Sequence, residues 1–134
     1  MSALLGGAGA ALLIGIGATL LGLDRERAFY PTVLAVIASY YGLFALMAGD
    51  LHSLVAECIV MGLFVLLVAL GYRRSLWLIV FALAAHGLFD AAHGRLIANP
   101  GMPPWWPAMC AAYDLVAAAY LALLLRRRRV PARA

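Results

Sequence analysis

Long apolar stretches separated by short polar breaks dominate the sequence. Five of these stretches approach or exceed 20 residues, which is about the length that an α-helix needs to cross a bilayer core of roughly 30 Å. They cover residues 3–23, 31–49, 51–72, 75–98 and 105–125. The pattern therefore predicts an all-α integral membrane protein with five transmembrane helices in a compact bundle.

The breaks between the stretches have the composition of turns. Residues 24–27 read Asp-Arg-Glu-Arg, Gly49 is followed by Asp50, and Arg73 by Arg74. Residues 99–104 cannot be helical throughout, because their prolines lack a backbone donor and restrict the residue that precedes them. No repeat or linker interrupts the order of helix and turn, so residues 1–134 are expected to form a single domain.

The composition excludes the usual soluble classes. Hydrophobic residues make up 66% of the chain and charged residues 12%, against about 45–50% and 25% in an ordinary soluble domain. A cytosolic enzyme, a secreted disulfide module and a disordered tail are all excluded. Cys58 and Cys110 lie far apart within apolar stretches, so both are expected to act as small buried hydrophobic residues.

The arginines predict the orientation. All ten basic residues are Arg, and nine of them fall on one side of a five-helix arrangement, with Arg95 alone near the other side. Because cytoplasmic loops carry the excess of Lys and Arg, the N-terminus is expected outside and the C-terminus in the cytoplasm. The arginine-only charge and the small size suggest a multi-pass protein of a bacterial inner (plasma) membrane. Topology explains the net charge of +4, so no nucleic-acid partner is expected.

The first helix is rich in small residues. Gly7, Ala11 and Gly15 recur every four positions, a spacing that lets a second helix approach closely. That helix belongs either to the same chain, to a second copy in a homo-oligomer, or to another subunit of a membrane complex. The sequence favours none of the three.

Ionisable residues gather at one depth of the predicted bundle. His86, Asp90 and His93 share one face of the fourth helix, Glu57 belongs to the third and Asp114 to the fifth. Counted along the helices, Glu57, Asp90 and Asp114 all lie about 10–13 Å below the outer surface. Ionisable residues inside a membrane usually mark a functional site. These five residues are therefore the candidate ligands of a divalent transition metal: zinc, iron or manganese.

A metal site at this depth predicts a membrane metalloenzyme, a hydrolase or oxidoreductase that acts on a lipid-like substrate. Glu57 or Asp114 would be the catalytic base, and Tyr41 and Tyr113 would support the ligands through hydrogen bonds. Two alternatives stay open at this point. The cluster could bind protons or another ligand in a transport component, or it could be a hydrogen-bond network in a non-enzymatic accessory or structural subunit of a membrane complex.

Aromatic and charged residues surround the predicted outer entrance. Trp105 and Trp106 follow a loop stiffened by prolines, and they are either an interfacial anchor or a fixed lid over the polar layer. Arg95 lies near the outer end of the fourth helix. It is expected to pair with Asp50 or with an anionic headgroup. Arg95, Trp105 and Trp106 together are expected to form the substrate entrance.

Overall fold

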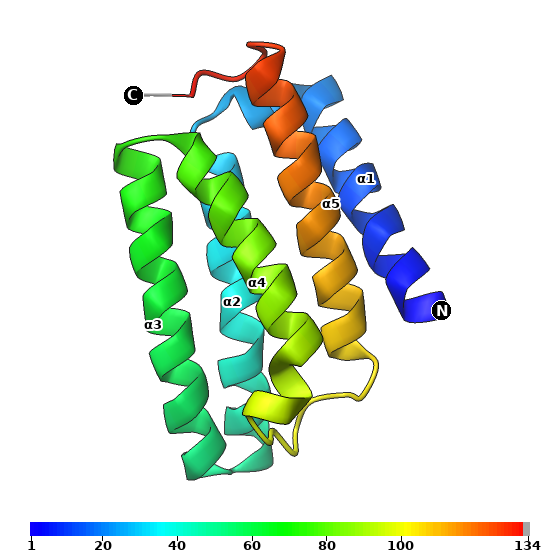
Figure 1. Ribbon diagram of the computed structural model, residues 1–134, viewed down its shortest axis with the longest axis vertical. Coiled ribbons are helices and arrows are strands. Elements are labelled where there is room, and N and C mark those ends of the chain that lie inside the picture. The colour runs from blue at the N-terminus through cyan, green and yellow to red at the C-terminus, as the bar shows by residue number, and fades with distance from the viewer. Residues whose placement is uncertain (133–134) are drawn as a thin grey trace.

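The computed structural model describes residues 1–132 as five long helices packed side by side (Figure 1). They are α1 (Ser2–Leu21), α2 (Phe29–Ala48), α3 (Leu51–Arg73), α4 (Leu76–Leu96) and α5 (Trp106–Arg126), with a short 3-10 helix, η1 (Leu23–Arg25), between α1 and α2. All five helices are long and apolar enough to span a membrane. The expected five-span helical architecture is confirmed, and each helix end lies within two residues of its predicted position.

Caps explain where the helices begin and end. Gly22 and Gly49 adopt left-handed conformations, with φ of 77° and 68°, and so end α1 and α2. The first helix therefore ends two residues earlier than predicted. Asp50 caps α3 by accepting hydrogen bonds from the backbone N–H and the hydroxyl of Ser53. The hydroxyl bond contributes most to holding the pKa of the partly exposed Asp50 carboxyl below its usual value.

The helices pack in a defined order. α4 lies against α5, α3 and α2, and α2 also lies along α3. α1 occupies the edge of the bundle, where it packs along α5 (Figure 1). The polar residues of α3, α4 and α5 thereby share one interior, while α1 lies outside it.

The small-residue stripe of α1 faces α5 of the same chain. Gly7, Ala11 and Gly15 are buried. A Cβ atom on Gly7 would lie 2.0 Å from the carbonyl oxygen of Met109, and one on Gly15 would lie 3.0 Å from the ring of Tyr120. The helix that approaches this stripe is thus a neighbour within the bundle, and the stripe offers no surface to a second copy.

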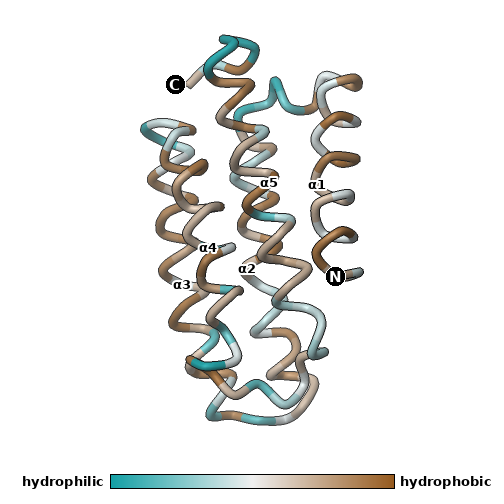
Figure 2. Tube along the Cα trace, turned by 45° about the vertical axis from the view of Figure 1, so that its right-hand side comes forward, coloured by the Kyte–Doolittle hydropathy of each residue, from teal (hydrophilic) through white to brown (hydrophobic). Residues whose placement is uncertain are grey.

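The two cysteines have different surroundings. Cys110 is buried, as expected, but Cys58 is exposed on α3, and the expectation that both are buried is wrong for Cys58. In a membrane bundle an apolar helix faces lipid on one side and its neighbours on the other, so hydropathy does not separate the two faces. Figure 2 shows this pattern, with apolar residues along the helices and polar residues mostly at the two ends.

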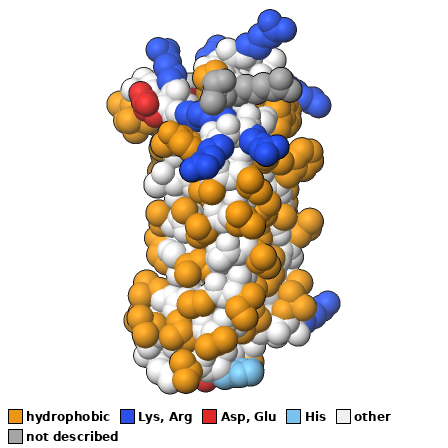
Figure 3. All heavy atoms as spheres, turned by 90° about the vertical axis from the view of Figure 1, so that its left-hand side faces the viewer, with side chains coloured by type: hydrophobic (Ala, Val, Ile, Leu, Met, Phe, Trp, Pro, Cys, Tyr) orange, Lys and Arg blue, Asp and Glu red, His pale blue; other side chains and the backbone are white. Residues whose placement is uncertain are grey.

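The two ends of the bundle differ in charge. Arginine side chains crowd the end where α1, α3 and α5 finish and the chain reaches its C-terminal residues (Figure 3). We call this the arginine-rich end, and the opposite end, with the α2–α3 turn and residues 97–105, the loop end. Arg95 lies near the loop end, and Arg133 lies outside the described residues. Arg27 links the α1–α2 connection to the end of α3, because it donates to the carbonyl oxygens of Tyr72 and Gly71 at 2.6 and 3.3 Å.

Candidate metal centre

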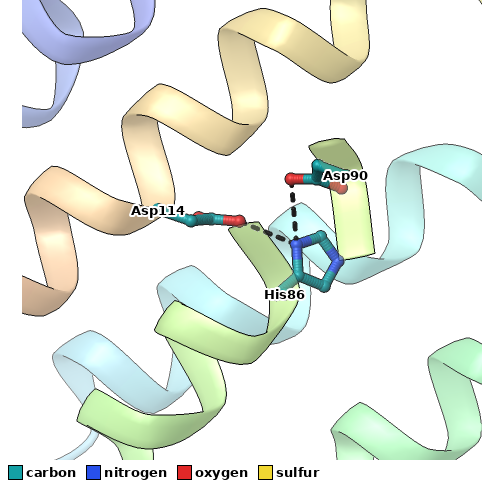
Figure 4. A group of neighbouring side chains, drawn as sticks. All are labelled: His86, Asp90 and Asp114. Carbon is teal, nitrogen blue, oxygen red and sulfur yellow. Dashed lines mark hydrogen bonds and ion pairs between the residues drawn. The ribbon is translucent and has the colours of Figure 1, made fainter. Parts of the chain in front are cut away.

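Three buried side chains converge between α4 and α5. His86 Nδ1 lies 2.7 Å from Asp114 Oδ2 and 3.3 Å from Asp90 Oδ2 (Figure 4). One ligand atom from each of the three residues lies within 4.8 Å of the others. We call His86, Asp90 and Asp114 the triad. One imidazole and two carboxylates at this spacing could hold a single metal ion.

The local sequence explains how the triad forms. His86 and Asp90 are four residues apart, so they lie on the same face of α4. Gly87 lets α5 come close to this face: a Cβ atom there would be 3.0 Å from the carbonyl oxygen of Ala111 and 3.2 Å from Cβ of Asp114. A larger residue at position 87 would push α5 away and separate Asp114 from His86.

The triad lies deep in the bundle. Along their helices, Asp90 is six residues from Leu96 and Asp114 is eight residues from Trp106, which places them about 9 and 12 Å from the loop end. His86 is one turn deeper. The side chains of the triad are no more than 1% exposed, so bulk water cannot stabilise their charges.

With both carboxylates ionised, the triad would carry more negative charge than its one imidazole can neutralise. Asp90 Oδ1 accepts a hydrogen bond from the Tyr41 hydroxyl at 2.8 Å. Asp90 Oδ2 and Asp114 Oδ1, in contrast, are buried without a hydrogen-bond partner among the described residues. Two ionised carboxylates beside one imidazole leave at least one uncompensated negative charge. A buried charge of this kind is costly unless a proton or a cation balances it.

Glu57 and His93 form a second cluster, separate from the triad. His93 Nε2 lies 2.8 Å from Glu57 Oε1, and the Asn99 amide donates to the same oxygen at 2.9 Å. This pair has a single carboxylate, so one proton is enough to balance its charge, although His93 Nδ1 is buried without a hydrogen-bond partner among the described residues. The five predicted ligands are thus divided: three converge in the triad, and two pair with each other nearer the loop end.

Tyr41 connects the two clusters. Its hydroxyl donates to Asp90, its ring stacks on His93 with the centroids 4.2 Å apart, and its carbonyl oxygen accepts from Asn99 at 3.0 Å. Tyr41 was expected beside the candidate ligands, and the structure places its hydroxyl against one of them, Asp90. Tyr113, the other tyrosine expected there, is half-buried and makes no side-chain hydrogen bond to the triad among residues 1–132.

The three predicted entrance residues, Arg95, Trp105 and Trp106, differ in their exposure and in their contacts. Arg95 is exposed and forms no ion pair within the described part of the chain, while Asp50 is engaged by Ser53. Trp105 is exposed, and Trp106 packs edge-to-face on Tyr40 and Phe44 with centroid distances of 5.2 and 5.0 Å. Trp106 is therefore part of the packing between α2 and α5.

Sequence reasoning missed three residues that shape this interior. Gly87 sets the α4–α5 approach, and its place between His86 and Asp90 was an available signal. The sequence contains no such signal for Asn99, because only the folded loop brings this residue to Glu57. Asp24 was taken for a loop charge, but it is 3% exposed and accepts a hydrogen bond from the Thr19 hydroxyl at 2.6 Å.

Comparison of the chain with protein-family models, with curated proteins and with solved structures finds no match. The functional argument therefore rests on the geometry of the triad.

Proposed function

We propose that this five-span membrane protein binds a divalent transition metal at His86, Asp90 and Asp114. One observation carries the proposal: two carboxylates with unpartnered oxygens face one imidazole in a fully buried site. A neutral imidazole and two ionised carboxylates sum to −2, which one divalent cation neutralises. The Glu57–His93 pair supports the assignment by contrast, since it holds one carboxylate beside one imidazole, where the triad holds two.

The ligand atoms narrow the choice of metal. One imidazole nitrogen with carboxylate oxygens suits zinc, iron or manganese better than metals that prefer sulfur. Three protein ligands also leave a coordination position for water or substrate, as in catalytic zinc sites. Hydrolytic or oxidative chemistry on a lipid-like substrate is compatible with such a site. Because the triad is buried, the same chemistry needs a path for the substrate to reach it.

The orientation belongs to the same proposal. The arginine-rich end would face the cytoplasm of a bacterial inner membrane and the loop end would face outside. The triad then lies at about 9–15 Å from the outer helix ends, counted at 1.5 Å per residue. Metal would reach it from the outer side, past the Glu57–His93 pair.

Proton binding at the triad is the competing function. The distances of 2.7 and 3.3 Å from His86 to the two carboxylates also suit a shared proton. Two protons on the triad would neutralise it as well as one divalent cation does. The two functions differ in one measurable property, which is the metal content of the protein.

Metal analysis of matched variants tests the proposal. The full chain is purified without chelator, incubated with zinc, iron(II) or manganese, desalted and analysed for metal. The wild type should hold about one ion per chain, and Asp114→Asn and Asp90→Asn should lose most of it, because amides keep the size of the side chain but remove the charge. Glu57→Gln is the matched control and should keep its metal.

Two results would contradict the proposal. A wild type that stays metal-free with all three metals would leave proton binding or a structural network as the role of the triad. A Glu57→Gln variant that loses as much metal as Asp114→Asn would show that the metal is held by the larger five-residue set.

A further inference from the structure

A large apolar groove lies between α1, α2 and α5, apart from the triad. Its volume is about 650 Å³, which is within the range of about 300–1,000 Å³ found for small-molecule sites. Ile14 of α1, Val33 and Ile37 of α2, and Cys110 and Tyr113 of α5 form much of its wall. Ile14 and Val36 are 46% and 47% exposed, so the groove opens sideways.

The packing order of the bundle creates this groove. α2 lies against α3 and α4, whereas α1 lies against α5. Hydrogen bonds hold the connection between α1 and α2 in place, from Thr19 to Asp24 and from Arg27 to the end of α3. The separation of α1 from α2, visible in Figure 2, is therefore part of the fold.

The groove requires an apolar occupant when the protein is in a membrane. Its walls are almost entirely hydrocarbon, so water would find few partners there. Leaving the space empty would forfeit dispersion contacts along all three helices. The molecule available at high concentration beside a transmembrane groove is a lipid, and its acyl chain has the matching chemistry.

The length of the groove matches one leaflet. Its lining along α2, with the N-cap residue of that helix included, runs from Ala28 to Tyr40, which is about 18 Å at 1.5 Å per residue. Half of a bilayer core is about 15 Å. The groove starts at the arginine-rich end and reaches Tyr40 and Trp106, whose rings contact each other. An acyl chain anchored at the arginine-rich end would fill it along this length.

The rim of the groove carries paired charges. Glu26 lines the arginine-rich end of the groove, and Arg25, the residue before it in the sequence, is exposed at the same end without lining the groove. One cation and one anion at a membrane surface complement a headgroup that has both a phosphate and an ammonium group. The arginines of this end attract any headgroup phosphate, and Glu26 at the groove itself favours a headgroup that also carries an ammonium group.

We propose that the groove binds one zwitterionic, amine-bearing phospholipid of the phosphatidylethanolamine type. One of its acyl chains lies between α1 and α2, its phosphate faces Arg25 and its ammonium group faces Glu26. The site is independent of the metal proposal, although its wall on α5 includes Cys110, one turn from Asp114.

Native mass spectrometry of the full chain tests this proposal. The protein is exchanged into mild detergent containing equal amounts of phosphatidylethanolamine and phosphatidylglycerol, and the retained lipids are counted and identified. The wild type should retain one phosphatidylethanolamine. Val33→Trp and Ile14→Trp, which fill the groove from opposite walls, should lose it. Val55→Trp, on the exposed face of α3, is the matched control and should retain it.

Glu26→Gln tests the headgroup assignment separately. This variant should still retain one lipid but should lose the preference for phosphatidylethanolamine over phosphatidylglycerol. Circular dichroism and gel filtration establish that each variant is folded, and if Val33→Trp is not, Ile14→Trp decides.

Three results would overturn the proposal. The first is a wild type that retains no lipid, and the second is retention in the folded groove-filling variants equal to that of Val55→Trp. The third is a wild-type dimer that Val33→Trp or Ile14→Trp converts to a monomer, because the groove would then hold a helix of a second copy.

Discussion

At the scale of single residues, Tyr41 joins the two polar clusters. Its hydroxyl is the one hydrogen-bond donor to Asp90 among the described residues, and its ring covers His93. Groups that hydrogen-bond to metal ligands fix the orientation of those ligands, and their removal costs about 10–100-fold in metal affinity. Tyr41 is therefore expected to orient Asp90.

Replacing Tyr41 tests this role. Tyr41→Phe should lower zinc affinity about 10–100-fold, because Asp90 Oδ1 loses its donor. The metal-free variant should also be less stable by about 1–3 kcal/mol, since a buried acceptor is left unpaired. Zinc titration and thermal unfolding measure the two effects. Tyr40→Phe is the control on the same helix, and equal effects at both positions would argue against an orienting role for Tyr41.

Helical periodicity predicted part of the site and obscured another part. It placed His86, Asp90 and His93 on one face of α4, and depth along the helices brought in Asp114. However, His86 and His93 are seven residues apart, which is about 10 Å along the axis. Residues that share a face can therefore belong to different clusters. Glu57 pairs with His93 and also accepts a hydrogen bond from Asn99, and no pattern in the sequence indicates these contacts.

At the scale of helices, glycines set two close approaches. Gly7 lets α1 lie against Met109 of α5, and Gly87 lets α4 lie against Ala111 and Asp114. Helices in a membrane associate largely by such close packing, since lipid provides little hydrophobic driving force between them. The second approach builds the triad, whereas the first holds α1 on the bundle.

Two glycines of α1 make a matched test of this packing. Gly7→Ala should destabilise the protein by about 1–3 kcal/mol, because the new methyl group collides with a backbone carbonyl. Gly9→Ala should leave stability unchanged or raise it slightly, since nothing lies within 4 Å of its Cβ position. Thermal unfolding in detergent compares the two. Similar changes at both positions would mean that α1 does not pack on α5 as described.

Helix positions could be predicted from the sequence because span length, turn composition and caps all indicate the same boundaries. The partners of each helix could not. Every helix is apolar on several faces, so the sequence did not show that α1 packs on α5 or that Cys58 faces outward. Only the close contacts in the fold distinguish the faces.

At the scale of the whole molecule, the arginines predict one orientation. A reporter active only in the cytoplasm should be active when fused at the C-terminus and inactive when inserted at Pro103 in the loop, because arginines concentrate at the C-terminal end. A periplasmic reporter should show the reverse. If both fusions reported the same side, the five-span arrangement and the depth of the triad would both be wrong.

The candidate metal centre and the apolar groove lie in different parts of the bundle. The triad lies between α4 and α5, with Tyr41 of α2 against it, while the groove lies between α1, α2 and α5. α5 is shared, with Asp114 directed to α4 and Tyr113 to the groove. Changes in α1 should therefore alter lipid retention without changing the metal content that the triad is proposed to provide.

X-ray absorption spectroscopy of the zinc-loaded protein tests the central claim most directly, because it reports the atoms bound to the metal. The triad predicts a first shell of nitrogen and oxygen only, at about 2.0–2.2 Å, with the scattering pattern of a single imidazole. A sulfur scatterer at about 2.3 Å would place Cys110 or Cys58 on the metal. That result, two imidazoles in the first shell, or a protein that binds no zinc would contradict the assignment of His86, Asp90 and Asp114.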